Sequence, residues 1–409
     1  MIRQALFVSA LLLVLYVVLA YAFYAGVASR APGANDYYSR WMGARALFLR
    51  GADPYSDAVT REIQMGMYGR LARPDEDQVA FAYPLYAAFF TLPLITLPYA
   101  WAESFWIALL MMLVGSAGVF LARSFRWLPK PLGLLGLLGF MLAFYPDLRG
   151  LFLGQYTLIL FASLAGALIL IASGRDGWAG IVLAASSVKP HVAMLAVIVV
   201  LSWGLWHRRW RLLGGWAAAM TALVVPALIL LPAWPLEFLG ALGRYQSYIT
   251  IGPPLQVWCE LLLPPTLSGP VTGLLTVILV AVLVYQWART VRQDWNAFLP
   301  TVEFAMLVTT MAMVRTATTD QTMLLVLWIH WLSRLVQTRR ARWAVLIALA
   351  VVAVPWIIFL TTLNGNLEAP VATTGAMTLT LIGYLVVHAR SGFAGLYADL
   401  CHLKLFKSV

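Results

Sequence analysis

The sequence predicts an all-α polytopic membrane protein. Of its 409 residues, 62% are hydrophobic and only 11% are charged, whereas a soluble domain carries about 25% charged residues. Runs of about 20 apolar residues recur along the whole chain, long enough for a helix to cross a bilayer. The short alternating segments of a membrane β-barrel are absent. We therefore expect one helical membrane domain over residues 1–409.

The net charge of +11 comes mainly from short basic loops between the apolar runs. Such loops face the cytoplasm in membrane proteins, and acidic or neutral loops lie between them. This alternation predicts a multi-pass protein of a cell inner or plasma membrane with both termini in the cytoplasm, and it makes nucleic acid an unexpected partner. The basic loops contain Arg123, Arg126 and Lys130; Arg175; residues 207–211; Arg289 and Arg292; residues 334–342; and Arg390, Lys404 and Lys407.

Residues 1–28 are expected to form the first membrane helix. The apolar run from Ala5 to Ala28 is too long for the apolar region of a signal peptide, and it lacks a clear cleavage site. We expect an outer loop over residues 29–80, core helices over 81–206 and further membrane helices over 207–409. These segments give about 12 crossings.

The loop over residues 29–80 concentrates acidic side chains just outside the first helix. The spacing of Tyr37, Trp41, Ala44 and Phe48 predicts an amphipathic helix ended by Gly51, lying along the membrane surface. A second helix is expected over about 56–70. The loop holds seven of the chain's 17 acids: Asp36, Asp53, Asp57, Glu62, Asp75, Glu76 and Asp77.

Asp36 stands at the start of the first of these helices. Its side chain can cap the helix by accepting a hydrogen bond from a free backbone N–H. It can also act as a general base at the boundary between water and lipid. The spacing alone leaves both interpretations open.

Prolines interrupt two apolar stretches further along the chain. Residues 81–99 contain three prolines, and a full crossing there would place the basic loop at 122–130 outside, so we expect a re-entrant or interfacial segment. Residues 179–206 begin and end at basic loops, and Pro190 breaks their middle. This predicts a hairpin of two short helices with Lys189 and His191 at its outer tip.

Four stretches follow one another in an informative order: "NDYYSRWMGARALFLRGADPYSD", "FAYPLYAAFFTLPLITLPYAWAESFW", "GQYTLILFASLAGALIL" and "AGIVLAASSVKPHVAML". Together they resemble glycosyltransferase family 87, the polyprenol-phosphate-mannose-dependent mannosyltransferases, which include the phosphatidylinositol-mannoside mannosyltransferase group. The similarity in motifs covers residues 30–205. The rest of the chain is similar only in the arrangement of its segments. It implies a GT-C-type bundle.

The resemblance also implies an activity and a base. An aspartate in the first outer loop acts as base in this family, and Asp36 is the position that matches. The implied reaction moves a sugar, mannose first, from a polyprenyl-phosphate donor to a hydroxyl of a lipid-linked or glycolipid acceptor on the outer face, with inversion. The implied partners are these two substrates and membrane lipids.

Several polar residues are candidates for contacts with the donor phosphate. A departing lipid phosphate gathers negative charge, so fixed cations should surround it. Lys189 offers a point charge and Arg315 a planar fork, and an ionisable group within a membrane is a functional candidate. Lys189 can equally be a snorkelling side chain at a loop tip. His191 can add a donor or simply be exposed.

Other polar residues are candidates for contacts with the sugar or the acceptor. Tyr37 and Tyr83 can contact the sugar or line the lipid groove, and Gln155 can bind a sugar hydroxyl or serve the end of its helix. Asp320 and Gln321 lie in the polar loop 314–322, where relatives often carry histidines. This departure leaves the acceptor open, and Asp320 can orient Asp36, bind the acceptor or add plain loop polarity.

No cofactor is expected from the sequence. There is no cluster of His and Cys ligands for a metal. Tyr38 stands two residues after Asp36, where a DxD metal motif needs an acid. Neither a P-loop nor a Rossmann glycine fingerprint is present, which disfavours a nucleotide-sugar donor.

Two other functional classes use similar features. A transporter or flippase of lipid-linked sugars would need the same basic groove but commonly shows internal repeats, and we find none. A surface-polysaccharide polymerase or ligase concentrates its function in a large late outer loop, whereas residues 233–268 are modest. A scaffold role leaves the charged first loop unexplained.

Overall fold

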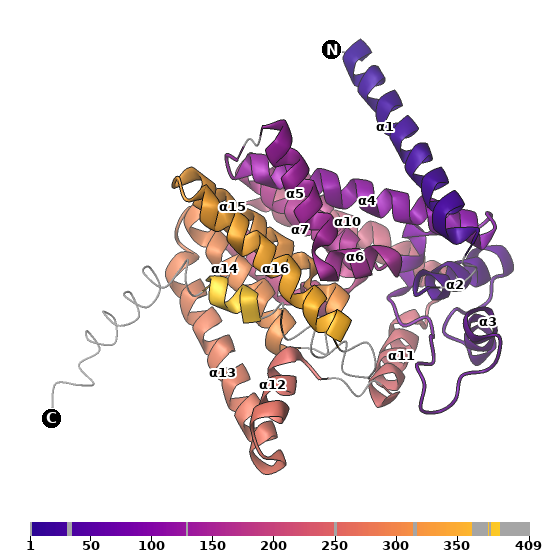
Figure 1. The fold of residues 1–409 in the computed structure, drawn as a ribbon. Helices are drawn as coiled ribbons and strands as arrows, with labels where there is room; N and C mark the ends of the chain where they lie inside the picture. The colour runs from indigo at the N-terminus through magenta and orange to yellow at the C-terminus, as the bar shows by residue number, and fades with distance from the viewer. Residues whose placement is uncertain are drawn as a thin grey trace.

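The computed structural model describes residues 2–30, 35–127, 130–248, 252–313, 317–361, 375 and 378–384. Every regular element in these ranges is a helix, as predicted (Figure 1). The first half comprises α1 (Ile2–Phe23) with its π-helical continuation η1 (Tyr24–Ala28), α2 (Tyr37–Arg50), α3 (Asp57–Tyr68), the 3₁₀ helices η2 (Leu85–Phe90) and η3 (Leu92–Leu94), α4 (Tyr99–Ser124), α5 (Pro131–Ala143), α6 (Tyr145–Phe152), α7 (Thr157–Ala172), α8 (Asp176–Ala184) and the 3₁₀ helix η4 (Ala185–Val188).

The second half continues the helical bundle. It comprises α9 (Pro190–Trp206), α10 (Trp210–Leu230), α11 (Trp234–Tyr248), α12 (Pro254–Leu262), α13 (Pro265–Thr290), α14 (Trp295–Val308), the π-helical η5 (Thr309–Met313), the 3₁₀ helix η6 (Thr318–Leu324), α15 (Leu325–Gln337) and α16 (Ala341–Thr361). Helix α1 projects away from the rest and leaves most of its side chains exposed (Figure 1).

Six helices of the described chain are long and apolar enough to cross a membrane, or seven if α5 and α6, which meet at a bend of 66°, form one span. The expected number of about 12 is not confirmed. Helices α7 and α9 are apolar but only 16 and 17 residues long, shorter than the about 20 residues that a full crossing needs. The six helices are Leu6–Ala28, α4, α10, α13, Trp295–Met313 and α16.

Both helices predicted in the first outer loop are present as α2 and α3. Gly51 ends α2 in the left-handed conformation, with φ of 64°, a conformation that glycine adopts without steric cost. However, α2 packs inside the protein instead of lying on an open membrane surface. Its Tyr37 ring stacks on Trp106, and its Trp41 indole donates a hydrogen bond to the Leu94 carbonyl.

Residues 81–99 contain no spanning helix, because their prolines break the chain into η2 and η3. The Tyr156 hydroxyl fixes this segment by hydrogen bonds to Thr91 Oγ1 at 2.9 Å and to the Ala87 carbonyl at 3.0 Å. The segment therefore lies against α7 within the protein.

The chain breaks at Lys189 and Pro190, between η4 and α9, as the sequence predicts. The expected exposed tip needs correction, since Lys189 is only 7% exposed. It is buried because its ammonium group forms an ion pair with Asp320 of η6. The break thus points into the protein.

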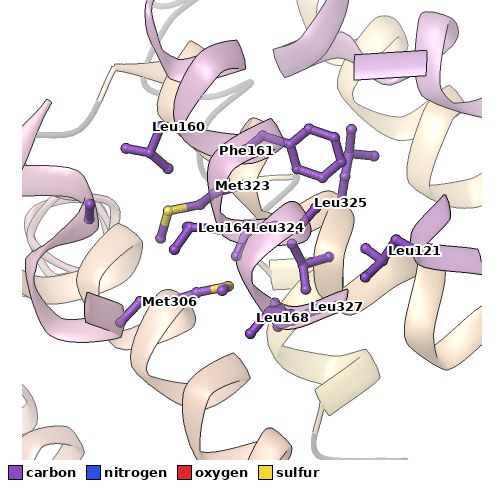
Figure 2. Packing of buried hydrophobic residues seen from close by; sticks show 14 of the residues in the cluster. Leu121, Leu160, Phe161, Leu164, Leu168, Met306, Met323, Leu324, Leu325 and Leu327 are labelled. Carbon is purple, nitrogen blue, oxygen red and sulfur yellow. The ribbon is translucent and has the colours of Figure 1, made fainter. Parts of the chain in front are cut away.

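A layer of apolar side chains fills the middle of the bundle (Figure 2). Helix α7 contributes four leucine or phenylalanine side chains to it, and α4, α14, η6 and α15 supply others. All are at most 3% exposed, so the layer is shielded from solvent. Its members include Leu160, Phe161, Leu164, Leu168, Met306, Met323, Leu324, Leu325 and Leu327.

The close contact between α8 and α10 depends on glycine. A Cβ atom added to Gly180 would overlap the Leu212 carbonyl oxygen and approach the Trp216 backbone nitrogen to 2.5 Å, whereas one added to Gly214 would meet nothing within 4 Å. We predict that Gly180→Ala lowers stability by about 1–3 kcal/mol through overpacking, and that Gly214→Ala does not. Thermal unfolding in detergent tests this; equal midpoints for the two variants would contradict it.

Candidate functional site

A cavity of about 400 Å³, which we call the Asp36 cavity, lies where α2, the loop before η2, α7, α9, α11 and η6 meet. Charged side chains from four segments far apart in the sequence line it. The polar lining residues are Asp36, Ser39, Arg40, Asp77, Tyr83, Gln155, Lys189, His191, Tyr245 and Asp320. The structure thus brings together six of the nine candidate residues named from the sequence.

Asp36 immediately precedes α2, but its side chain does not cap the helix. Asn35 performs that role, because its Oδ1 accepts a hydrogen bond of 2.9 Å from the Tyr37 backbone N–H. The Asp36 carboxylate instead accepts a hydrogen bond from Gln155 Nε2 and faces the cavity. Of the two interpretations open from the sequence, capping is therefore not observed.

Asn35 fixes the backbone next to Asp36. Besides its bond to Tyr37, Oδ1 accepts a hydrogen bond of 2.7 Å from the Tyr99 hydroxyl. Its Nδ2 donates to Glu103 Oε1 and to the Phe152 carbonyl, each at 2.7 Å. These bonds use both donors and both acceptor sites of the amide, so Asn35 anchors Asp36 to α4 and α6. Sequence reasoning missed this residue, since its partners lie 64 to 117 positions away.

Arg40 places a positive charge one helical turn after Asp36. The side chain is buried at 3% exposure, and its guanidinium donates to the Asp36 carbonyl, to the Tyr83 hydroxyl and, at 3.0 Å, to Gln155 Oε1. It also lies 4.6 Å from the centre of the Tyr83 ring. These hydrogen-bond partners are neutral, although the charge of the nearby Asp36 carboxylate also acts on the guanidinium. Arg40 thus presents its positive charge to the same cavity as Asp36. Sequence analysis missed Arg40 among the other arginines of the loop.

Gln155 joins the two charged groups. Its Nε2 donates to Asp36 and its Oε1 accepts from Arg40. The turn that positions it needs Gly154, which has a φ of 61° and whose added Cβ would lie 2.7 Å from Tyr37 Cβ. The Gln155 backbone N–H then bonds the Gly150 carbonyl at 2.9 Å and closes the end of α6.

Lys189 and Asp320 form an ion pair at the side of the cavity, with side chains 8% and 1% exposed. Asp320 also accepts hydrogen bonds from Thr157 Oγ1 at 2.8 Å and from the Ala317 backbone N–H at 3.0 Å. The positive charge of Lys189 is therefore already matched by a carboxylate. Asp320 does not contact Asp36 through any described hydrogen bond.

Asp77 adds a second carboxylate to the cavity that the sequence marked only as one loop acid among seven. Burial raises the pKa of its carboxyl group, and the charge of Asp36 acts in the same direction. Its Oδ1 accepts a hydrogen bond of 2.9 Å from the Val79 backbone N–H. Val79 has a φ of 48°, which is rare for a β-branched residue.

Among the described residues, no group of three metal-ligating side chains occurs.

Two candidates do not line the Asp36 cavity, and a third lies outside the described residues. Tyr37 is fully buried against Trp106, with ring centres 4.8 Å apart, because its side chain points into the core side of α2. Gln321 is fully buried in η6, on a different side from Asp320. Arg315 lies outside the described residues.

The sequence profile of glycosyltransferase family 87 matches residues 81–314, more than half of the chain. The chain belongs to glycosyltransferase family 87. With its spanning helices, it is therefore a membrane glycosyltransferase. Gln155, Lys189 and His191 lie within the matched range, whereas Asp36 and Arg40 precede it. Neither the curated proteins nor the solved structures that we searched gave a match to this glycosyltransferase.

The buried ion pair of this family 87 member makes a prediction about stability. Removing one partner leaves an unmatched buried charge, so Lys189→Met should destabilise the protein by about 3–5 kcal/mol, and the double variant Lys189→Met/Asp320→Leu should recover much of this loss. Thermal unfolding of the single and double variants in detergent measures the coupling. The exposed pair Arg50 and Glu62 is the control, because Glu62→Gln should cost no more than about 1 kcal/mol. Additive effects of the two buried substitutions would disprove the coupling.

Proposed function

We propose that this enzyme transfers mannose from a polyprenyl-phosphate donor to a hydroxyl group of a lipid-linked or glycolipid acceptor at the outer face of the membrane, with inversion. The observation that carries the proposal is the Asp36 carboxylate, which lines a cavity, is not used as a cap and is held by Gln155. Asp36 removes the acceptor proton as the acceptor oxygen bonds the anomeric carbon. The bond from that carbon to the phosphate oxygen breaks, and the lipid phosphate leaves with the electron pair.

Arg40 is the cation that suits the departing phosphate best. Its hydrogen-bond partners are neutral, it is fixed by Tyr83 and Gln155, and its guanidinium can bind two phosphate oxygens. A preorganised cation in a water-poor site stabilises negative charge that develops in the transition state. His191, in the first turn of α9, is a second donor to the phosphate, and Arg315 remains a candidate outside the described residues.

Lys189 has a different part in the proposed reaction from the one that the sequence suggested. Because Asp320 matches its charge, Lys189 contributes less to phosphate binding than an unpaired cation would. The pair instead holds η4 and α9 against η6, and so keeps His191 at the edge of the cavity. Tyr83, whose hydroxyl is bound to Arg40, presents its ring as a surface for the sugar.

The interior of the bundle supports transfer over transport. A flippase needs a path along which a polar headgroup passes from one end to the other. Between the two ends of α7, the side chains of Leu160, Phe161, Leu164 and Leu168 are apolar and offer such a headgroup no polar contact (Figure 2). The Asp36 cavity is thus a reaction chamber at one end of the protein.

We predict that Asp36→Asn lowers sugar transfer about 10²–10⁴-fold, the usual contribution of general base catalysis. The measurement is incubation of the purified protein with polyprenyl-phosphate mannose and candidate lipid acceptors, followed by mass analysis of the products. Asp57→Asn, at an exposed carboxylate of the same loop, is the matched control and should keep full activity. Activity of Asp36→Asn close to that of the parent protein would remove Asp36 as the base.

Arg40→Lys keeps a positive charge but loses the planar fork. We predict that kcat/KM for the donor falls at least about tenfold, because a hydrogen bond to a charged group contributes about 1.5–3 kcal/mol, while KM for the acceptor changes little. Arg50→Gln, at the exposed end of the same helix, should change neither value. If Arg40→Lys altered only the acceptor KM, the phosphate role of Arg40 would be refuted.

A further inference from the structure

A second cavity, which we call the basic cavity, lies at the end of the bundle opposite to the Asp36 cavity. Its volume is about 470 Å³. It is formed by the last residues of α4, α7 and α15 and by the first turns of α14. The same helices run from the Asp36 cavity across the apolar layer to this end, so the two cavities are separate.

The lining of the basic cavity is rich in donors. Arg126, Arg334 and His330 contribute cationic or protonatable groups, and Asn296 and Gln337 add amides. None of the described residues that line it is Asp or Glu. The nearest acid in the sequence, Asp294, is occupied as the cap of α14, since its Oδ1 accepts the Ala297 backbone N–H at 3.0 Å.

His330 and Glu303 form a polar pair inside the membrane part of the protein. Glu303 is fully buried in α14, and its Oε1 bonds His330 Nδ1. Its other oxygen has no hydrogen-bond partner. The abundance of arginine in cytoplasmic loops does not account for this pair, since both residues lie within helices, where ionisable groups are costly and commonly functional.

The pair orients the imidazole toward the cavity. Glu303 Oε1 occupies Nδ1, so Nε2 is the ring nitrogen left for a ligand. The Phe125 ring stacks on the imidazole at 4.4 Å and fixes its plane. When Nε2 carries the hydrogen, it can donate a hydrogen bond to an anion.

The two arginines complete the arrangement. Neither the Arg126 nor the Arg334 side chain has a carboxylate partner in the part of the chain that the structure describes. The start of α14, at Trp295 and Asn296, adds the positive end of a helix dipole. Leu121, Leu168 and Leu299 form an apolar wall beside these groups.

We propose that the basic cavity is a binding site for a phosphate group, with His330, Arg126 and Arg334 as its donors. Two arginines, an imidazole and a helix N-terminus around one cavity favour a compact anion with several acceptor oxygens. The apolar wall allows that phosphate to belong to a lipid as well as to be free. This site is independent of the reaction proposed for the Asp36 cavity.

Titration of the full-length protein in neutral detergent, followed by native mass spectrometry, tests the site. The three probes are inorganic phosphate, dioctanoyl phosphatidic acid and dioctanoylglycerol, which is the same lipid without phosphate. We expect binding of phosphatidic acid, of inorganic phosphate or of both, and none of dioctanoylglycerol. Binding of the lipid alone identifies a lipid phosphate, and binding of both identifies the phosphate group as sufficient.

Matched variants locate the binding. Arg334→Gln and His330→Gln should weaken it at least about tenfold, and Arg334→Gln, at an exposed side chain, keeps the test valid if His330→Gln fails to fold. Arg123→Gln removes the same charge from an exposed residue of α4 that does not line the cavity, so it should leave binding unchanged. The proposal is overturned if no probe binds, if Arg123→Gln weakens binding equally, or if only Arg40→Gln in the Asp36 cavity abolishes it.

Discussion

The candidate active site depends on one amide side chain that holds a carboxylate and a guanidinium at the same time. Gln155 donates to Asp36 and accepts from Arg40, so the proposed base and the proposed phosphate receptor keep a fixed separation. Elements far apart in sequence serve this bridge. Gly154 allows the turn that aims Gln155, and Asn35 fastens the residue before Asp36 to α4 and α6. Hydrogen bonds made by one uncharged amide therefore fix the positions of both charged groups.

The helical membrane fold could be predicted from composition, because only an apolar chain can fill a bilayer with satisfied backbone groups. Residue spacing, a glycine and a proline were also enough to predict helix α2, its end at Gly51 and the break at Pro190. The number of spans could not be predicted. Hydropathy measures how apolar a stretch is, whereas α7 is apolar because it lies in the centre of the protein.

The site was predictable only in part, for a physical reason. Asp36 and Gln155 stood in stretches that resembled a known family, and the structure places both at one cavity. From the sequence, Arg40 could not be distinguished from the other arginines of the loop. The residues that position it, Tyr83 and Gln155, lie 43 and 115 positions away. Lys189 looked like a free cation because nothing in its own segment reveals Asp320. A long-range partner changes what a charged residue can do, and a single sequence does not show such partners.

The apolar layer has a consequence for proton transfer between the two cavities. Titratable groups such as Asp36 and His330 lie on its two sides, and between them Leu160, Phe161 and Leu164 offer no hydrogen-bonding group. Protons hop along chains of water or polar atoms, so Leu160, Phe161 and Leu164 cannot themselves pass a proton from the Asp36 cavity toward the basic cavity.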